Sequence, residues 1–178
     1  MVSVARAVRS PLAWIVAAVV VAVTATAIVL LEPWKLIIDT TVTEAVPTVT
    51  PATGSGGTPA AGPVVLAEGS FVSHEHHTSG TVRILRLPDG SRVLRLEDLD
   101  TSDGPDVRVW LTDQTVTDDW FTFDNGHHVD LGSLKGNKGN QNYAVPPELD
   151  LAAFVSADLW CDRFNVSFGA ATLVRTGN

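Results

Sequence analysis

The sequence predicts an all-β domain, either an antiparallel β-sandwich or a barrel-like fold, preceded by one transmembrane helix and a disordered linker. Two observations support this prediction: a long uncharged apolar run near the N-terminus, and later short apolar segments separated by Gly, Pro, Asn and Asp. Short strands with such turns are typical of sandwiches and barrels. The expected divisions are a cytoplasmic N-terminus at 1–10, a transmembrane helix at 11–32, a linker at 33–66 and the β domain at 67–175.

The apolar run at residues 12–31 has no charged side chain, and only two threonines interrupt it. Twenty helical residues span about 30 Å, the thickness of the hydrocarbon core of a bilayer. Arg6 and Arg9 precede the run, so the positive-inside rule predicts a cytoplasmic N-terminus and a domain outside the cell membrane. The alternative is a cleaved signal peptide, because residues 25–27 resemble a cleavage site. We favour an uncleaved single-pass anchor, since the apolar run continues past that site.

The composition changes at residues 40–63, which are mainly Thr, Pro, Gly, Ala and Val with Glu44 as the one charged side chain. A segment of this kind cannot bury a core, so we expect a disordered stalk. As a coil it would reach roughly 25–30 Å on average and hold the following domain away from the membrane.

The first strands of the domain are expected at 80–87 and 91–99, joined by a turn at Pro88-Asp89-Gly90. Their apolar side chains alternate, imperfectly, with four arginines, which predicts one buried face and one face that carries the arginines. Further strands are expected at 107–111, 118–126, 128–131, 154–160 and 164–174, with a Gly- and Asn-rich loop at 132–143.

The net charge of −8 belongs to the C-terminal domain, because the first 67 residues carry three acidic and three basic side chains. Nucleic-acid binding rewards clustered Lys and Arg, so an acidic domain argues against a nucleic-acid partner. The same charge argues against docking of the domain onto anionic lipid.

Cys161 is the only cysteine, which excludes an internal disulfide. The apolar residues before it lie at odd positions, so its thiol is expected to point inward with Leu159, whereas those from Phe164 onward lie at even positions. A flat strand cannot change faces in this way, so we expect a bulge or tight corner at 162–163. At such a corner Cys161 is either a reachable thiol, with Arg163 favouring the thiolate, or a small buried hydrophobe.

The histidines form two groups, His74, His76 and His77 in one and His127 and His128 in the other. On a strand, the first two would share one face and the third would lie on the opposite face. Imidazoles together with a thiol suit copper or zinc, but no spacing here matches a known metal motif, and a surface loop is the alternative. Covalent haem attachment as usually encoded is excluded because Cys-x-x-Cys-His is absent. No motif identifies a cofactor, so the cofactor is unknown and a bound haem or metal ion is left as an alternative.

Four segments, at 77–82, 104–107, 131–143 and 159–170, occur in an order that resembles the DM-thirteen domain, and the likeness covers about 68–174. It is most specific in the Gly- and Asn-rich loop and in the Trp-Cys segment. The resemblance implies an extracellular β-sandwich-type module with an electron-transfer or redox role, through a naked thiol or a bound prosthetic group. Its hallmark cysteine corresponds to Cys161, the candidate redox thiol or ligand. The candidate binding residues are His77, Trp160, Asn140, Asn142 and Tyr143.

The sequence therefore favours a membrane-anchored extracytoplasmic module with a redox or electron-transfer role centred on Cys161. The alternative is a non-enzymatic adhesion or scaffold domain in which Cys161 is a structural core residue. No hydrolase elbow is present, so we do not expect a classical enzyme. The expected partners are the membrane, through residues 12–31, and a redox or cell-surface protein.

Overall fold

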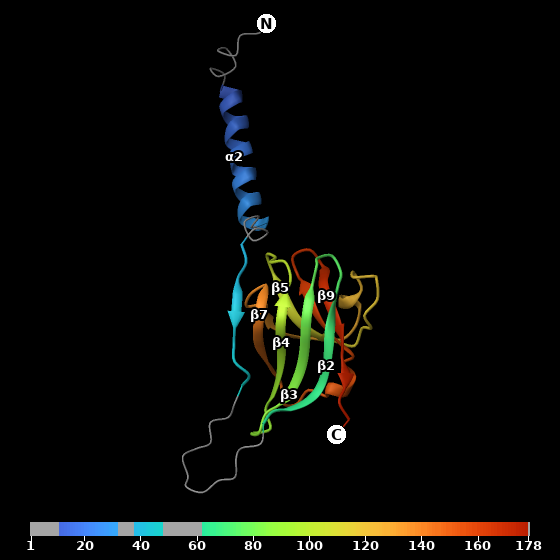
Figure 1. Ribbon diagram of the computed structural model, residues 1–178. Coiled ribbons are helices and arrows are strands. Elements are labelled where there is room, and N and C mark those ends of the chain that lie inside the picture. Colours follow the sequence, from blue (N-terminus) through green and yellow to red (C-terminus); the bar gives the residue numbers. More distant parts are fainter. Residues whose placement is uncertain (1–10, 32–37, 48–61, 178) are drawn as a thin grey trace.

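The structure, a computed structural model, describes residues 11–31, 38–47 and 62–177. It confirms a mostly β protein preceded by one apolar helix, α2 (Pro11–Leu31) (Figure 1). The expected cytoplasmic segment at 1–10 and most of the expected linker lie outside the described residues. The strands are β1 (Thr41–Thr43), β2 (Val64–Ser73), β3 (Ser79–Arg86), β4 (Arg92–Asp100), β5 (Val107–Thr112), β6 (His128–Ser133), β7 (Lys138–Val145), β8 (Ser156–Cys161), β9 (Val166–Thr172) and β10 (Val174–Arg175). Two short 3-10 helices, η2 (Phe123–Asn125) and η3 (Leu151–Ala153), interrupt the connections.

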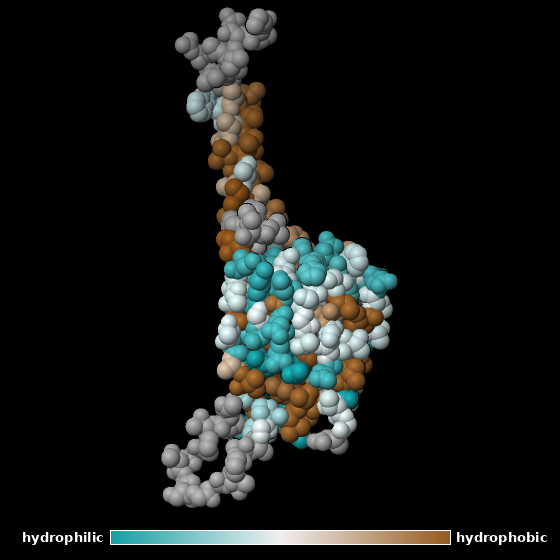
Figure 2. All heavy atoms as spheres, viewed as in Figure 1, coloured by the Kyte–Doolittle hydropathy of each residue, from teal (hydrophilic) through white to brown (hydrophobic). Residues whose placement is uncertain are grey.

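Helix α2 is apolar on all sides, and none of its residues is buried against the β domain. Figure 2 shows it as a hydrophobic column that projects above a domain whose visible surface is mostly hydrophilic or intermediate, with hydrophobic patches at its lower end and right. An apolar surface of this length is unfavourable in water and matches the interior of a bilayer. By length and composition α2 is a candidate membrane span, which indicates a single-pass membrane protein.

The ten strands form one strongly curled sheet in the order β1-β7-β4-β3-β2-β9-β8-β5-β6, with β10 added beside β2. Strand β2 joins the two halves of the sheet: residues 64–70 pair with β3, and residues 71–73 pair with β9. Strands β6 and β7, from the two halves, lie close together, so the sheet approaches a barrel. All neighbouring strands are antiparallel except β1 and β7, which run parallel.

The β3–β4 hairpin follows the sequence prediction closely. Its turn is closed by Asp89, whose Oδ1 accepts hydrogen bonds from the backbone N and the Oγ of Ser91, at 2.9 and 2.6 Å. Gly90 supplies the positive φ of +87° that the turn requires. Of the arginines expected on the open face, Arg83 is partly exposed beside Glu97, but Arg95 is buried. The burial of Arg95 differs from the prediction because another segment covers this part of the face.

The domain has two apolar cores, one on each side of β8. The main core fills the inside of the curled sheet, and a smaller one lies outside it, around Trp110, Phe123, Trp160 and Ala170. All six residues of β8 are therefore buried. The segment that covers the smaller core includes residues 118–126, where a strand was expected. That prediction is wrong, because local side-chain hydrogen bonds, such as Phe121 N to Asp119 Oδ1, favour turns and a 3-10 helix here.

Part of the expected linker is instead attached to the sheet. Residues 39–45, which we call the clip, contain β1 and lie along β7 and β4. The expected loop at 132–143 is correspondingly strand from Lys138 onward. Gly136 and Gly139 make this pairing possible, because an added Cβ would lie 2.4 Å from the carbonyl oxygen of Thr40 and 2.1 Å from that of Val42, respectively. A stalk was predicted from composition alone, whereas the pairing depends on contacts distant in sequence.

Candidate functional site

Cys161 is the last residue of β8 and pairs with Val107 on β5 and Val166 on β9. Its side chain belongs to the main core and is completely buried, with 0% exposure. The inward direction that the sequence predicts for this thiol is therefore correct. Of the two roles left open for the residue, its position matches the small buried hydrophobe.

The expected corner after Cys161 is a four-residue turn at 162–165. The backbone N–H groups of Phe164 and Asn165 both donate to the carbonyl oxygen of Cys161, at 3.2 and 2.8 Å, and Asn165 adopts a positive φ of 55°. Phe164 was expected to point inward, but it is 51% exposed because the turn, not a strand, contains it. The inward series begins at Val166 and continues with Phe168.

The surroundings of Cys161 disfavour its thiolate. Burial raises the pKa of the thiol, although backbone N–H groups of Phe164, Asp106 and Arg163 act in the opposite direction. The Arg163 side chain, expected to favour the thiolate, is exposed and donates from Nη1 to the carbonyl oxygen of Leu30 at 2.9 Å. Because the thiolate is the nucleophile in exchange reactions, the burial of Cys161 and the raised pKa of its thiol disfavour thiol–disulfide exchange in the folded domain.

Trp160 lies on the opposite face of β8 and belongs to the smaller core, with 1% exposure. Its indole stacks on that of Trp110, with ring centroids 5.0 Å apart and an angle of 21° between planes. Trp110 stacks in turn on the imidazole of His128, at 3.8 Å and 9°. His128 is half-buried, so three stacked rings lead from the residue beside Cys161 towards the surface.

A buried polar chain, missed by the sequence analysis, runs beside this stack. Ser167 Oγ donates to Asp158 Oδ1 and shares a second hydrogen bond, of 2.7 Å, with His74 Nδ1. Asp158 is fully buried, and this burial raises the pKa of its carboxyl to about 8. In the described part of the chain, Asp158 Oδ2 and His74 Nε2 have no hydrogen-bond partner. The available signal was the charged residue in the middle of an apolar strand.

Most of the histidines pack against aromatic side chains. His74 packs against Trp120 and Phe123, and His76 lies over Phe168 with ring centroids 4.0 Å apart. His77 is exposed in the loop between β2 and β3, whereas Cys161 is enclosed in the main core, so the structure does not bring these two candidates together. Within residues 11–31, 38–47 and 62–177, no three His, Cys, Asp or Glu side chains form a group that could hold a metal ion.

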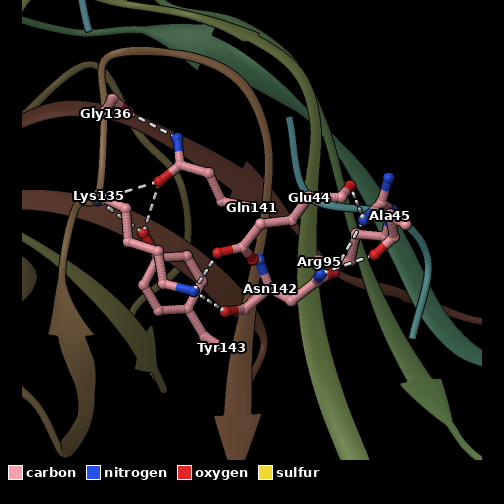
Figure 3. Close-up of polar contacts among 8 residues, drawn as sticks. All are labelled: Glu44, Ala45, Arg95, Lys135, Gly136, Gln141, Asn142 and Tyr143. Carbon is pink, nitrogen blue, oxygen red and sulfur yellow. Dashed lines mark hydrogen bonds and ion pairs between the residues drawn. The ribbon is translucent and has the colours of Figure 1, made fainter. Parts of the chain in front are cut away.

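The remaining candidates, Asn140, Asn142 and Tyr143, lie on β7. Figure 3 shows Asn142 facing Glu44 and Ala45 of the clip, whereas the Tyr143 side chain lies beside Gln141 and Lys135. Asn142 donates from Nδ2 to the carbonyl oxygen of Ala45 at 2.9 Å, and its backbone N donates to Glu44 Oε2 at 2.7 Å. The carbonyl oxygen of Asn140 accepts from the backbone N of Glu44 at 2.9 Å. These polar groups of the Gly- and Asn-rich motif therefore bind a segment of the same chain.

Charged side chains strengthen this contact. Lys135 Nζ lies 2.8 Å from Glu44 Oε1, and this hydrogen bond lowers the pKa of Glu44. Arg95 donates to the carbonyl oxygen of Glu44 at 3.1 Å and to Asn142 Oδ1 at 2.8 Å, which explains why its guanidinium is buried. The Tyr143 hydroxyl is buried and donates to Gln141 Oε1 at 2.8 Å, and burial raises its pKa to about 12.

The fold and site together define a curled β-sheet module that follows a single candidate membrane helix and encloses one thiol in its core. The family described as Electron transfer DM13 matches residues 70–173, which is more than half of the chain. The chain belongs to this family, and the resemblance drawn from the sequence is confirmed. Searches of curated proteins and of solved structures found no match. The clip and α2 lie outside the matched residues.

Proposed function

We propose that this protein is a membrane-anchored electron-transfer module in which the Trp160-Cys161 segment is the redox-active element. Membership of an electron-transfer family and the apolar helix α2 support the proposal. Arg6 and Arg9 precede the helix, which favours an N-terminus in the cytoplasm and a β domain on the outer side of the membrane. The helix acts as an uncleaved signal anchor.

Direct thiol–disulfide chemistry does not fit the folded domain. Exchange requires an accessible thiolate, whereas Cys161 is fully buried and burial raises its thiol pKa. A redox role for this residue therefore requires an electron to move while the thiol stays in place. The ring stack Trp160–Trp110–His128 supports this role, because it places overlapping aromatic surfaces between the residue beside Cys161 and the half-buried imidazole of His128.

In the proposed step, one electron leaves the Cys161 sulfur, passes through the stacked rings and reduces a one-electron acceptor outside the domain. The thiol S–H bond breaks, and its proton passes to the partly exposed carboxylate of Asp106, whose charge acts on the thiol, and from there to water. The cysteine becomes a thiyl radical. Asp158 and His74, at the two ends of the buried polar chain, lie on the Trp160 side of β8. They place polar groups near the path of the electron through the stacked rings.

A second candidate function is supported by the burial of Cys161 itself. A free cysteine packed among apolar side chains serves as a small core residue, and a scaffold or adhesion domain needs nothing more from it. The two candidates differ in whether the buried sulfur can be oxidised from outside.

A ruthenium(III) polypyridyl complex, generated by a flash of light, tests this difference because it accepts one electron but is too large to enter the core. The full chain in lipid nanodiscs is oxidised, and freeze-quench EPR and thiol titration after unfolding follow Cys161. We expect a sulfur-centred radical and loss of the thiol, slowed by Trp110→Phe but not by Trp120→Phe, which is outside the stack. An unchanged thiol in the wild-type chain, or equal rates in both variants, would support the scaffold function instead.

A further inference from the structure

The clip limits the distance between the domain and the end of α2. Six residues separate Leu31, the last residue of the helix, from Ile38. An extended chain advances at most about 3.5 Å per residue, so this connection spans no more than about 25 Å. From Asp39 to Ala45 the chain is held to the sheet by β1, by hydrogen bonds and by ion pairs with two lysines. The domain is therefore tied close to the helix end, and the residues between 47 and 62 add nothing to this reach.

The direction of the domain relative to α2 is also defined. Arg163, in the turn between β8 and β9, donates to the carbonyl oxygen of Leu30, so this turn lies at the C-terminal end of the helix. The turn follows Cys161 directly. Figure 1 shows α2 above this end of the sheet, with the C-terminus of the chain at the opposite end.

Two large aromatic side chains are exposed at the same end. Phe121 is 57% and Phe164 is 51% exposed, and both border a pocket of about 370 Å³. The other lining residues are Glu75, His76, Val166 and Phe168. Phenyl groups exposed to water gain free energy when they enter the boundary between head groups and acyl chains.

The charges at this end identify the kind of lipid surface that fits. Glu75, Asp103, Asp106 and Asp162 lie in the loops beside the pocket or in the neighbouring turns, and Arg163 is the basic side chain of the β8–β9 turn. These carboxylates would be repelled by a strongly anionic surface. Contact with lipid would therefore depend on the aromatic rings and on the clip, and it would be strongest on an uncharged surface.

We propose that the end of the domain that bears Phe121 and Phe164 rests on the lipid surface that its own helix enters, with both phenyl rings in the interfacial layer. This inference rests on the membrane anchoring in the proposed function. It assigns a lipid-contacting surface to a domain whose overall charge is acidic, and it directs the Cys161 end towards the membrane.

The test uses the full chain in phosphatidylcholine nanodiscs whose lipids carry a nitroxide quencher at the head group. A fluorophore is attached to Glu75→Cys, which borders the pocket and leaves both rings in place, or, at the opposite end, to Gly90→Cys; the buried Cys161 stays unlabelled in the folded chain, and Cys161→Ala provides a second background. We expect strong quenching at position 75 and none at position 90. Equal quenching at both positions, in a chain that co-purifies with the discs, would overturn the orientation. A chain that does not enter the discs would instead refute the anchor itself.

A second comparison tests the aromatic rings. With the fluorophore on Glu75→Cys, replacing both Phe121 and Phe164 by Ser should cause a loss of quenching. Replacing Val72 and Val174 by Ser is the matched control, because these valines are 49% and 64% exposed and lie outside this pocket. Undiminished quenching in the double Phe variant would show that the rings do not contact lipid and would overturn the proposal.

Discussion

Gly139 leaves space for the backbone carbonyl of Val42, since a Cβ at Gly139 would lie 2.1 Å from that oxygen. Its φ of +93° is a further reason for glycine. We expect Gly139→Ala to release the clip from β7. Hydrogen exchange of the Glu44 amide, which is bonded to Asn140, would become fast.

The matched control for this change is Gly90→Ala. Gly90 also has a positive φ, of +87°, but an added Cβ there would meet nothing within 4 Å. Alanine at this site should lower the free energy of unfolding by only about 1 kcal/mol, the intrinsic penalty for a left-handed alanine. If both variants left the Glu44 amide equally protected, the close contact between Gly139 and the clip would be unimportant.

Asp158 should make the stability of the domain depend on pH. Its carboxyl has a pKa of about 8 in the folded state, against an ordinary value of 3.8, so the folded state holds one more proton between these two pH values. The contribution of this carboxyl to the free energy of unfolding is therefore fully present below about pH 4. It decreases as pH rises towards 8, by up to about 1.4 kcal/mol per pH unit. Chemical unfolding at several pH values should show this fall in the wild-type chain and a flatter profile in Asp158→Asn. The same slope in both proteins would contradict the assignment.

Ser167 connects Asp158 and His74 inside the fold, so removing its hydroxyl should cause a large loss of stability for so small a group. In Ser167→Ala both neighbours lose a partner, and we expect the free energy of unfolding to fall by about 1–3 kcal/mol. Ser91→Ala, at the exposed β3–β4 turn, should change it by less than about 0.5 kcal/mol. Thermal unfolding of the two variants side by side measures the difference, and similar values would mean that the buried polar chain contributes little.

A charge in α2 should prevent membrane insertion. Val20→Lys places an ammonium near the centre of the helix, where it costs about 2.5–3.5 kcal/mol in insertion free energy. Val72→Lys is the control, because Val72 is also an exposed valine but lies on β2. Membrane fractionation should move the Val20 variant towards the soluble or degraded fraction and leave the Val72 variant unchanged.

The elements that could be predicted are those whose sequence signals are local. Helix α2 follows from twenty uncharged residues, and the β3–β4 hairpin follows from the turn chemistry of Asp89 and Gly90. The inward direction of Cys161 followed from the parity of β8. Phe164 was misplaced because parity cannot distinguish a strand that changes faces from a turn that interrupts it.

The features that could not be predicted depend on contacts between distant segments. Residues 138–143 were read as a loop because Gly and Asn favour turns, whereas here glycine accommodates the clip and asparagine bonds to it. The burial of Arg95 has the same origin. The link between His74 and Asp158 joins residues 84 positions apart through Ser167, and no spacing rule could reveal it.

The clip also affects how the protein would respond to proteolysis. The covalent path from α2 to most of the β domain runs through residues 47–62, but β1 binds β7 independently of that path. A protease that cuts between these positions would leave two fragments joined by the ladder from Thr41 to Thr43 and by the Glu44–Lys135 ion pair. Shedding of the domain from cells would therefore need a cut before Asp39, or dissociation of the clip after the cut.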